Sequence, residues 1–529
     1  MKTFQEPRSP RRLAQLPRWE TGLLIGFLAI GLIGIFNHAM WRDELNGWLI
    51  AKYSQNWGEF WGNIRYEGHP ILWYLCLYGL NQLTANPVAM QLFHLALATA
   101  AMALWLYFSP FTRLQKVLFV LGYLPIYEYL VISRNYAIGL LTLFAICVLF
   151  PTRQKSYLPL AIALAILANT NAYGLLIAIA LGLTLILEYL CRKALNLSLS
   201  SSPANRILSI IIVLAGIALS VIMLMPPGDA NLQGGANQWF FQWDFHRFNQ
   251  ALSRIWNSYI LILVPGDSKP LDVLIFSVLS LGLLGFCMTL FWEFPLVLSF
   301  YLLGSSSILL FTYLKFLGSA RHYGHLYLIL ITAFWLKSYY QPSPLLSQLS
   351  PFKVWGDHQR HLLSQWQTWV KRHQKTFLMV LLICQMIAGL IGLIRDLTLP
   401  YSASRETAHY LKVNHLDQEF LMGSEDFAMT PISGYLGQKI YYPESQTMGS
   451  FVLFNSQRKP VNDDEILQLA QKQLQQQNLS QLILILNHPL DQKAQEKQSS
   501  LNVKAIAAMT RSFIGNEQYY LYRVSQTGS

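Results

Sequence analysis

The amino-acid sequence predicts an α-helical polytopic membrane protein that carries a small soluble α/β domain at its C-terminus. Hydrophobic residues make up 53% of the 529 positions, charged residues make up only 12%, and the mean hydropathy is +0.32. This composition is too apolar for a soluble enzyme. Before residue 400 the chain holds repeated apolar runs, many of them long enough to cross about 30 Å of hydrocarbon as a helix, and after it the chain becomes polar.

Eleven apolar runs are expected to span the membrane, and one further run is expected not to. The spans are predicted at residues 21–39, 88–108, 117–132, 136–150, 158–168, 172–190, 207–225, 271–291, 294–314, 326–336 and 376–394. Loops on the cytoplasmic side of a membrane are enriched in Lys and Arg. The short basic loops share that side only if residues 70–83 do not cross, so this run is predicted to be an interfacial helix on the outer face.

Each crossing moves the chain to the opposite side of the membrane, so the parity of the crossings assigns a side to every loop. The same parity defines the remaining parts of the chain. Residues 1–20 are predicted to be a basic cytoplasmic N-terminus, and residues 21–399 form the membrane module. This module has outer loops at residues 40–87 and 226–270 and a cytoplasmic loop at residues 337–375. The polar region, residues 400–529, is predicted to be an α/β domain on the outer, periplasmic side of the inner or plasma membrane.

The polar region alternates helix-like and strand-like patterns. Helices are predicted at residues 406–415 and 463–477, and strands at residues 419–424, 439–443, 450–454, 481–486 and 519–525. Amphipathic helices alternating with short apolar strands are typical of a small α/β fold.

Several classes of protein are disfavoured by the composition. The five cysteines lie in or beside apolar runs, so no disulfide framework is indicated. The net charge of +12 is spread over short loops rather than one basic stripe, so no nucleic-acid partner is expected. No metal or other cofactor is assigned, because hard cations need more oxygen ligands than any one cluster offers; a divalent metal stays an open alternative.

Charged and polar side chains gather in the segments that parity assigns to the outer side. The candidates are Arg42, Asp43, Glu44, Glu67, His69, Glu128, Arg134, Asn135, Arg321 and His322. Each has an ordinary structural alternative, such as an ion pair in a solvated loop or an arginine that extends to lipid headgroups. Together they suit transfer from a phosphate-linked donor, in which a carboxylate accepts a proton and cations hold the departing phosphate.

The arrangement resembles membrane glycosyltransferases of the GT-C superfamily, in particular protein O-mannosyltransferases and the bacterial aminoarabinose transferases that modify lipid A. These enzymes carry an Asp-Glu pair soon after the first span, which Asp43 and Glu44 of "RDELNGWLIA" match. A segment of the type E-K-P-P-L-x-Y-W follows in the family. Its counterpart "EGHPILWYL" matches at Glu67, Pro70, Leu72 and Tyr74, and "SARHYGHLYLIL" resembles the basic-aromatic segment that opens a late span.

The resemblance implies an inverting glycosyltransferase of the cell envelope. It would move a sugar from a polyprenyl-phosphate donor to a hydroxyl group of a lipid, glycan or protein at the outer face, surrounded by membrane lipids. Asp43 is the predicted general base, because an apolar wall disfavours the ionised form of a nearby carboxylate. Glu44 is its predicted catalytic partner, which orients the loop or contacts the sugar.

The other candidates receive roles around this pair. Arg134, Arg321, His322 and His69 are predicted to bind the donor phosphate, and Arg42, Glu67, Glu128 and Asn135 are predicted to contact sugar or acceptor or to orient loops. Two alternatives from other classes remain. One is a multispan transporter, with Glu128 and Glu188 on a permeation path, and the other is a non-catalytic assembly protein that binds polyprenyl lipids.

Overall fold

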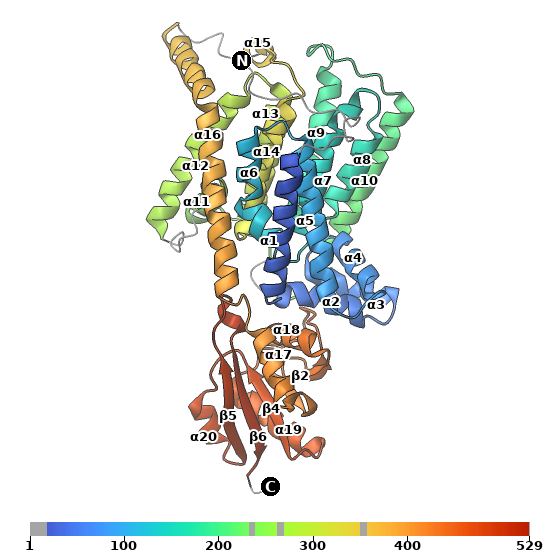
Figure 1. The fold of residues 1–529 in the computed structure, drawn as a ribbon, viewed down its shortest axis with the longest axis vertical. Helices are drawn as coiled ribbons and strands as arrows, with labels where there is room; N and C mark the ends of the chain where they lie inside the picture. The colour runs from blue at the N-terminus through green and yellow to red at the C-terminus, as the bar shows by residue number, and fades with distance from the viewer. Residues whose placement is uncertain (1–17, 232–237, 262–268, 350–356, 528–529) are drawn as a thin grey trace.

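A computed structural model describes residues 18–231, 238–261, 269–349 and 357–527. The chain forms a bundle of helices with a smaller domain, containing the sheet, at one end (Figure 1). Among the described residues, eight helical segments are long and apolar enough to cross a membrane. They are α1 (Arg18–Asn37), α5 (Val88–Phe108), α7 with the short turn after it (Tyr136–Gln154), α9 (Ala172–Cys191), α10 (Pro203–Leu224), α12 (Pro270–Phe291), α13 (Pro295–Leu314) and the His361–Thr398 part of α16 (Asp357–Thr398).

These eight segments coincide with eight of the eleven predicted spans. The run at residues 158–168 forms α8 (Leu158–Ala168), which is only 11 residues long, and the run at residues 326–336 lies within α14 (Ala320–Lys337). The run at residues 117–132 is broken. It forms α6 (Arg113–Val120) and a short π-helix, Leu124–Glu128, that contains Pro125. Proline lacks a backbone N–H, so it interrupts the regular helical hydrogen bonds.

The break in this run lets α16 come close. A Cβ atom on Gly389 would lie 2.4 Å from the carbonyl oxygen of Leu121, so only glycine permits this approach. Gly392, one turn further on, packs against the ring of Tyr127 in the same way. The close contact fixes α16 against the bundle and brings Asp396, near the end of α16, to the loop that follows α1.

Three short helices connect α1 to α5: α2 (Arg42–Tyr53), α3 (Trp57–Ile64) and α4 (Leu72–Asn81). They lie at the end of the bundle that faces the C-terminal domain, opposite α15 (Leu345–Leu349) (Figure 1). The predicted interfacial helix corresponds to α4. With ten residues and a rise of about 1.5 Å per residue, α4 spans about 15 Å, which is too short to cross a bilayer.

The C-terminal domain holds a six-stranded mixed sheet with the strand order β3-β2-β1-β4-β6-β5. The strands are β1 (Leu421–Gly423), β2 (Ile440–Tyr442), β3 (Thr447–Gly449), β4 (Gln481–Leu486), β5 (Leu501–Met509) and β6 (Tyr519–Gln526). The helices are α17 (Ser404–Val413), α18 (Asp426–Leu436), α19 (Asp463–Gln476) and α20 (Gln492–Lys497). Apolar side chains pack on both faces of the sheet, and α18 contacts α2 of the bundle.

The predicted strand at residues 450–454 is wrong. The neighbouring residues 447–449 form β3 instead, and the backbone of Val452 pairs with a side chain rather than with a strand. Its N–H donates to Oδ1 of Asn46 over 2.8 Å, and Nδ2 of Asn46 donates to its carbonyl oxygen over 3.1 Å. An amide side chain thus takes the place of a neighbouring strand and joins the C-terminal domain to α2.

Candidate functional site

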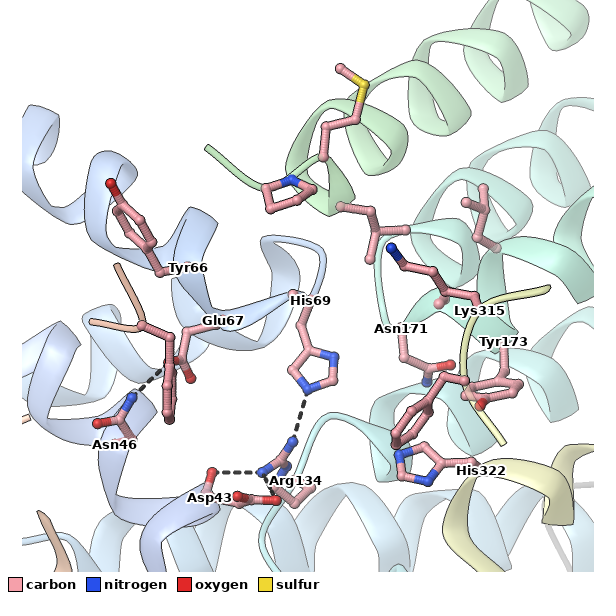
Figure 2. A pocket seen from close by; sticks show the side chains of 18 of the residues that line it. Asp43, Asn46, Tyr66, Glu67, His69, Arg134, Asn171, Tyr173, Lys315 and His322 are labelled. Atoms are coloured by element: carbon pink, nitrogen blue, oxygen red, sulfur yellow. Dashed lines mark hydrogen bonds and ion pairs between the residues drawn. The ribbon is translucent and has the colours of Figure 1, made fainter. Parts of the chain in front are cut away.

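The predicted outer segments converge on a cavity of about 590 Å³ between the bundle and the C-terminal domain (Figure 2). Its polar side chains include Asp43, Glu67, His69, Arg134 and His322, and its apolar ones include Leu175, Leu176, Val221, Leu224, Met225 and Phe311. The C-terminal domain contributes Phe427, Thr430, Val452 and Phe454. One cavity therefore borders an apolar wall of the bundle, a cluster of charges and the polar domain.

Asp43 lies in the first turn of α2 and faces the cavity. Its Oδ2 is 2.9 Å from Nη1 of Arg134 and 3.8 Å from Nη1 of Arg321, and its side chain is 35% exposed. Burial acts to raise the pKa of Asp43, but the surrounding guanidinium groups, Arg134 first, hold it below its usual value. The predicted effect of an apolar wall on this carboxylate is therefore wrong in sign. Asp43 is ionised at neutral pH and accessible from the cavity.

Glu44 points away from the cavity and is fully buried. Its Oε1 accepts the backbone N–H of Ser133 over 2.7 Å, and its Oε2 accepts from Nε2 of His38 over 2.9 Å and from the N–H of Trp41. Successive residues of a helix are turned by about 100°, which explains the opposite directions of the pair. Glu44 therefore binds the start of α2 and the backbone before Arg134, and it does not line the cavity.

A buried chain of charges extends from Glu44 to the end of α16. Nδ1 of His38 lies 3.1 Å from both carboxylate oxygens of Asp396, while its Nε2 bonds to Glu44. Since both ring nitrogens face carboxylates, both carry protons and the ring is a cation. Arg405 of α17 donates to the carbonyl oxygens of Phe36 and Asn37, which closes the C-terminal end of α1.

Arg134 is the cation closest to Asp43. Besides the ion pair, its Nη1 donates to the carbonyl oxygen of Asp43 over 2.8 Å, and its Nη2 lies 2.8 Å from Nε2 of His69. A guanidinium group only donates, so Nε2 of His69 is the acceptor and Nδ1 carries the proton. Burial, together with the charge of Arg134, lowers the pKa of His69 to about 3. His69 is therefore neutral.

Arg321 and Glu128 form a buried pair outside the cavity lining. Nε of Arg321 is 2.8 Å from Oε1 of Glu128, and Tyr123 donates to the other oxygen of that carboxylate. Arg321 also donates to the hydroxyl of Tyr401 and stacks over the ring of Trp41. Arg321 reaches the site only through its long contact with Asp43, so its effect on that carboxylate is electrostatic rather than a direct contact with the cavity.

Glu67 lines the cavity near Asp43 (Figure 2). Gly68, which follows it, has a φ of 67°, a left-handed conformation that suits glycine and turns the chain back toward His69. Asn46 donates to Oε1 of Glu67 over 2.6 Å, and the hydroxyl of Tyr74 donates to its Oε2 over 3.2 Å. Burial raises the pKa of Glu67 to about 7, against the opposing charge of Arg134. Glu67 is the second carboxyl group that faces the cavity.

The three remaining candidates have different surroundings. Arg42 lines the cavity and bonds to the C-terminal domain, through Nη1 to Asn516 over 2.7 Å and through its backbone N–H to Glu517. His322 also lines the cavity, and its Nδ1 accepts the N–H of Ser319, which leaves Nε2 as the protonated nitrogen of a neutral ring. Asn135 is buried and donates to a backbone carbonyl outside the lining, so it has a structural role.

Other residues of the cavity were not predicted from the sequence. Lys315 follows α13 directly and lines the wall opposite Glu67 (Figure 2). Lys315 directly follows a predicted span and lies six residues before Arg321. This position in the sequence could have placed it among the candidates. Phe427, Thr430 and Phe454 come from the C-terminal domain, and no local pattern distinguishes them from ordinary core residues.

Within the described ranges, no group of three or more His, Cys, Asp or Glu side chains is arranged to hold a metal ion. No model of a known protein family matches the chain, and no curated protein matches it significantly. The chemistry of the cavity is therefore the basis for assigning a function.

Proposed function

We propose that this protein is an inverting glycosyltransferase of the GT-C type. It would take a sugar from a polyprenyl-phosphate donor and transfer it to a hydroxyl group at the outer face of the membrane. The observation that carries the proposal is the composition of the cavity, which joins an apolar wall to an accessible, ionised Asp43 beside Arg134. A donor with an apolar tail and a charged head requires both parts in one site.

The apolar wall supports a lipid-borne donor. Val221 and Met225 of the α10 end line the cavity and are also 42% and 54% exposed on the surface of the bundle. Leu175 and Leu176 of α9 continue this wall inward. An apolar chain can therefore lie against the bundle in the bilayer while its head reaches the charged residues.

The proposed reaction uses groups of the polar part. Asp43 accepts the proton of the acceptor hydroxyl, whose oxygen forms a bond to the anomeric carbon of the sugar. The bond from this carbon to the phosphate oxygen breaks, and its electron pair stays on the phosphate. Arg134 stabilises the developing negative charge, and Asp43 afterwards releases the proton to water. Attack from the side opposite the phosphate inverts the anomeric configuration.

The proposed location is the inner or plasma membrane, crossed up to eleven times, with the cavity and the C-terminal domain on the outer side. The bias of Lys and Arg toward the opposite loops supports this orientation. The contact of α18 with α2 independently supports a common side for the C-terminal domain and residues 40–87.

The two alternative functions are less well supported. A permeation path would need accessible charges, but Glu188 is buried in a bidentate contact with Arg153, as Glu128 is paired with Arg321. A protein that only binds polyprenyl lipids would use the apolar wall, yet it would not need a carboxylate that is both ionised and accessible.

The proposal is tested with purified protein in nanodiscs and radiolabelled polyprenyl-phosphate sugars as donors. Replacement of Asp43 by Asn should reduce transfer by about two to four orders of magnitude, the usual contribution of a positioned base. Donor binding should persist, because the substitution leaves Arg134 in place. The fold should also persist, since Asp43 is partly exposed.

Glu67→Gln is the matched variant, because Glu67 lines the same cavity. A glutamine there can accept from Nδ2 of Asn46 and donate to the hydroxyl oxygen of Tyr74, which now donates to Glu67. Full activity of Asp43→Asn together with an inactive Glu67→Gln would transfer the role of base to Glu67. Absence of any sugar transfer by the wild-type protein, with donors and acceptors of all three classes, would refute the glycosyltransferase assignment.

A further inference from the structure

Lys315 differs from the other cations around the cavity. It follows the last residue of α13 and lies on the wall across from Asp43 and Glu67 (Figure 2). Its Nζ is 4.9 Å from the centre of the Trp239 ring. Among the described residues, no carboxylate lies within ion-pair distance of this ammonium group.

The other cations of the region are already neutralised. Arg134 is paired with Asp43, and Arg321 is paired with Glu128. Arg42 bonds to Asn516 and lies 3.8 Å from Glu517. Partial burial lowers the pKa of Lys315, as expected for an ammonium group withdrawn from water without a counter-charge. An anion bound in the cavity would supply that charge.

The surroundings of Lys315 restrict the kind of anion. Trp239 lies against the ammonium group, and Phe311 lies one helical turn before Lys315. Both line the cavity together with Leu224 and Met225, so Lys315 adjoins the apolar wall. A small hydrophilic anion gains nothing from this wall. A phosphate ester of a long apolar alcohol fits both features, since its chain contacts the wall and its head reaches the cation.

We propose that Lys315 binds the phosphate group of a polyprenyl phosphate at the membrane-facing rim of the cavity. This inference rests on the proposed function and deepens it, because it assigns the primary phosphate contact to a residue outside the resembling motifs. The sugar of the donor then extends from Lys315 across the cavity toward Asp43 and Glu67. Arg134 stays with Asp43 and meets the phosphate only as the glycosidic bond breaks.

The test measures binding of radiolabelled polyprenyl monophosphate, without sugar, to full-length protein in phosphatidylcholine nanodiscs. Lys315→Met should weaken binding about ten- to a hundredfold, the range for loss of one charge-assisted contact, and Lys315→Arg should retain most of the affinity. Lys52→Met is the matched control. Lys52 is also half-buried over an aromatic ring, that of Tyr53, but lies outside the cavity, so this variant should bind as wild type.

Three competitors distinguish the sources of the phosphate. Neutral polyprenol and inorganic phosphate should compete weakly, because each offers only half of the ligand. Phosphatidylglycerol in the nanodisc should also compete weakly; equal competition would make this a general headgroup contact and overturn the inference. Unchanged affinity of Lys315→Met would overturn it as well.

The inference and the proposed function fail in different ways. If Lys315→Met loses binding but the wild-type protein transfers no sugar, the phosphate site stands and the transferase assignment falls. If the wild-type protein transfers sugar and Lys315→Met matches it in both binding and turnover, the assignment stands and the role of Lys315 falls.

Discussion

Replacement of Glu44 by Gln tests whether this residue supports the structure rather than the chemistry. Three donors, Nε2–H of His38 and the backbone N–H groups of Trp41 and Ser133, converge on its two oxygens. Glutamine offers one acceptor oxygen, so its NH₂ group must face at least one of these donors. Removing one partner of a buried ion pair costs about 3 to 5 kcal/mol. Asp396 still balances the charge of His38, so we expect about 3 kcal/mol, the lower end of that range.

The assay is the thermal unfolding midpoint of the purified protein in detergent, compared with Glu406→Gln as control. Glu406 is exposed on α17, near the same end of the bundle, and its replacement should leave the midpoint unchanged. Glu44→Gln should lower the midpoint by several degrees. Membranes kept well below that midpoint should retain most of the proposed transferase activity. A variant with wild-type stability and no activity would refute the structural role and return Glu44 to the catalytic pair.

Two further predictions concern charge and orientation. The pKa of Glu67 is raised to about 7, so the folded state favours its protonated form, and this contribution to stability is lost as pH rises from about 4.5 through 7. The stability of Glu67→Gln relative to wild type should therefore rise by about 2.5 kcal/mol from pH 5 to pH 8, measured by thermal unfolding. A constant difference would contradict the raised pKa. In a background without the native cysteines, Leu83→Cys and Val413→Cys, both exposed, should react with an impermeant reagent in intact cells, and Ser198→Cys should not. Labelling of Ser198→Cys alone would reverse the proposed orientation.

The sequence predicted the helical membrane module because apolar runs are a local signal. A proline inside an apolar run interrupts the helix, and there the predicted continuous span differs from the structure. Pro125 divides one predicted span into α6 and a short π-helix, and the gap accommodates α16. That approach depends on Gly389, which lies far along the chain from Pro125, and no local pattern contains both residues.

The candidate site was also predicted only in part, because the sequence pattern does not give the direction of a side chain. The parity of the loops assigned Asp43, Glu67 and Arg134 to one side of the membrane, and these three residues line the same cavity. Parity assigns a side of the membrane but not the direction of a side chain. It therefore could not separate Asp43 from Glu44, nor recognise that His69 is neutral because a guanidinium group donates to it.

The C-terminal domain was predicted as a separate unit, and its part in the site was missed for a physical reason. Asn46 forms both backbone hydrogen bonds of Val452, and this replaces the strand expected at residues 450–454. The apolar residues there, including Phe454, look like strand residues because they are apolar, but they pack against α2 and the cavity. A sequence pattern shows that a residue is apolar, but it does not show which other residues pack against it.

The buried charges connect the cavity to the C-terminal domain through α16. The ring of His38 bonds to Asp396 on one side and to Glu44 on the other. Glu44 in turn accepts the backbone N–H groups of Trp41, at the start of α2, and of Ser133, the residue before Arg134. Asp43 thus directly precedes Glu44, and Arg134 directly follows Ser133, whose N–H group Glu44 binds. The chain continues from Asp396 within a few residues to the C-terminal domain, whose residues also line the cavity. A displacement of that domain must therefore move either its own wall of the cavity or the contacts that position Asp43, so the C-terminal domain and Asp43 are mechanically linked.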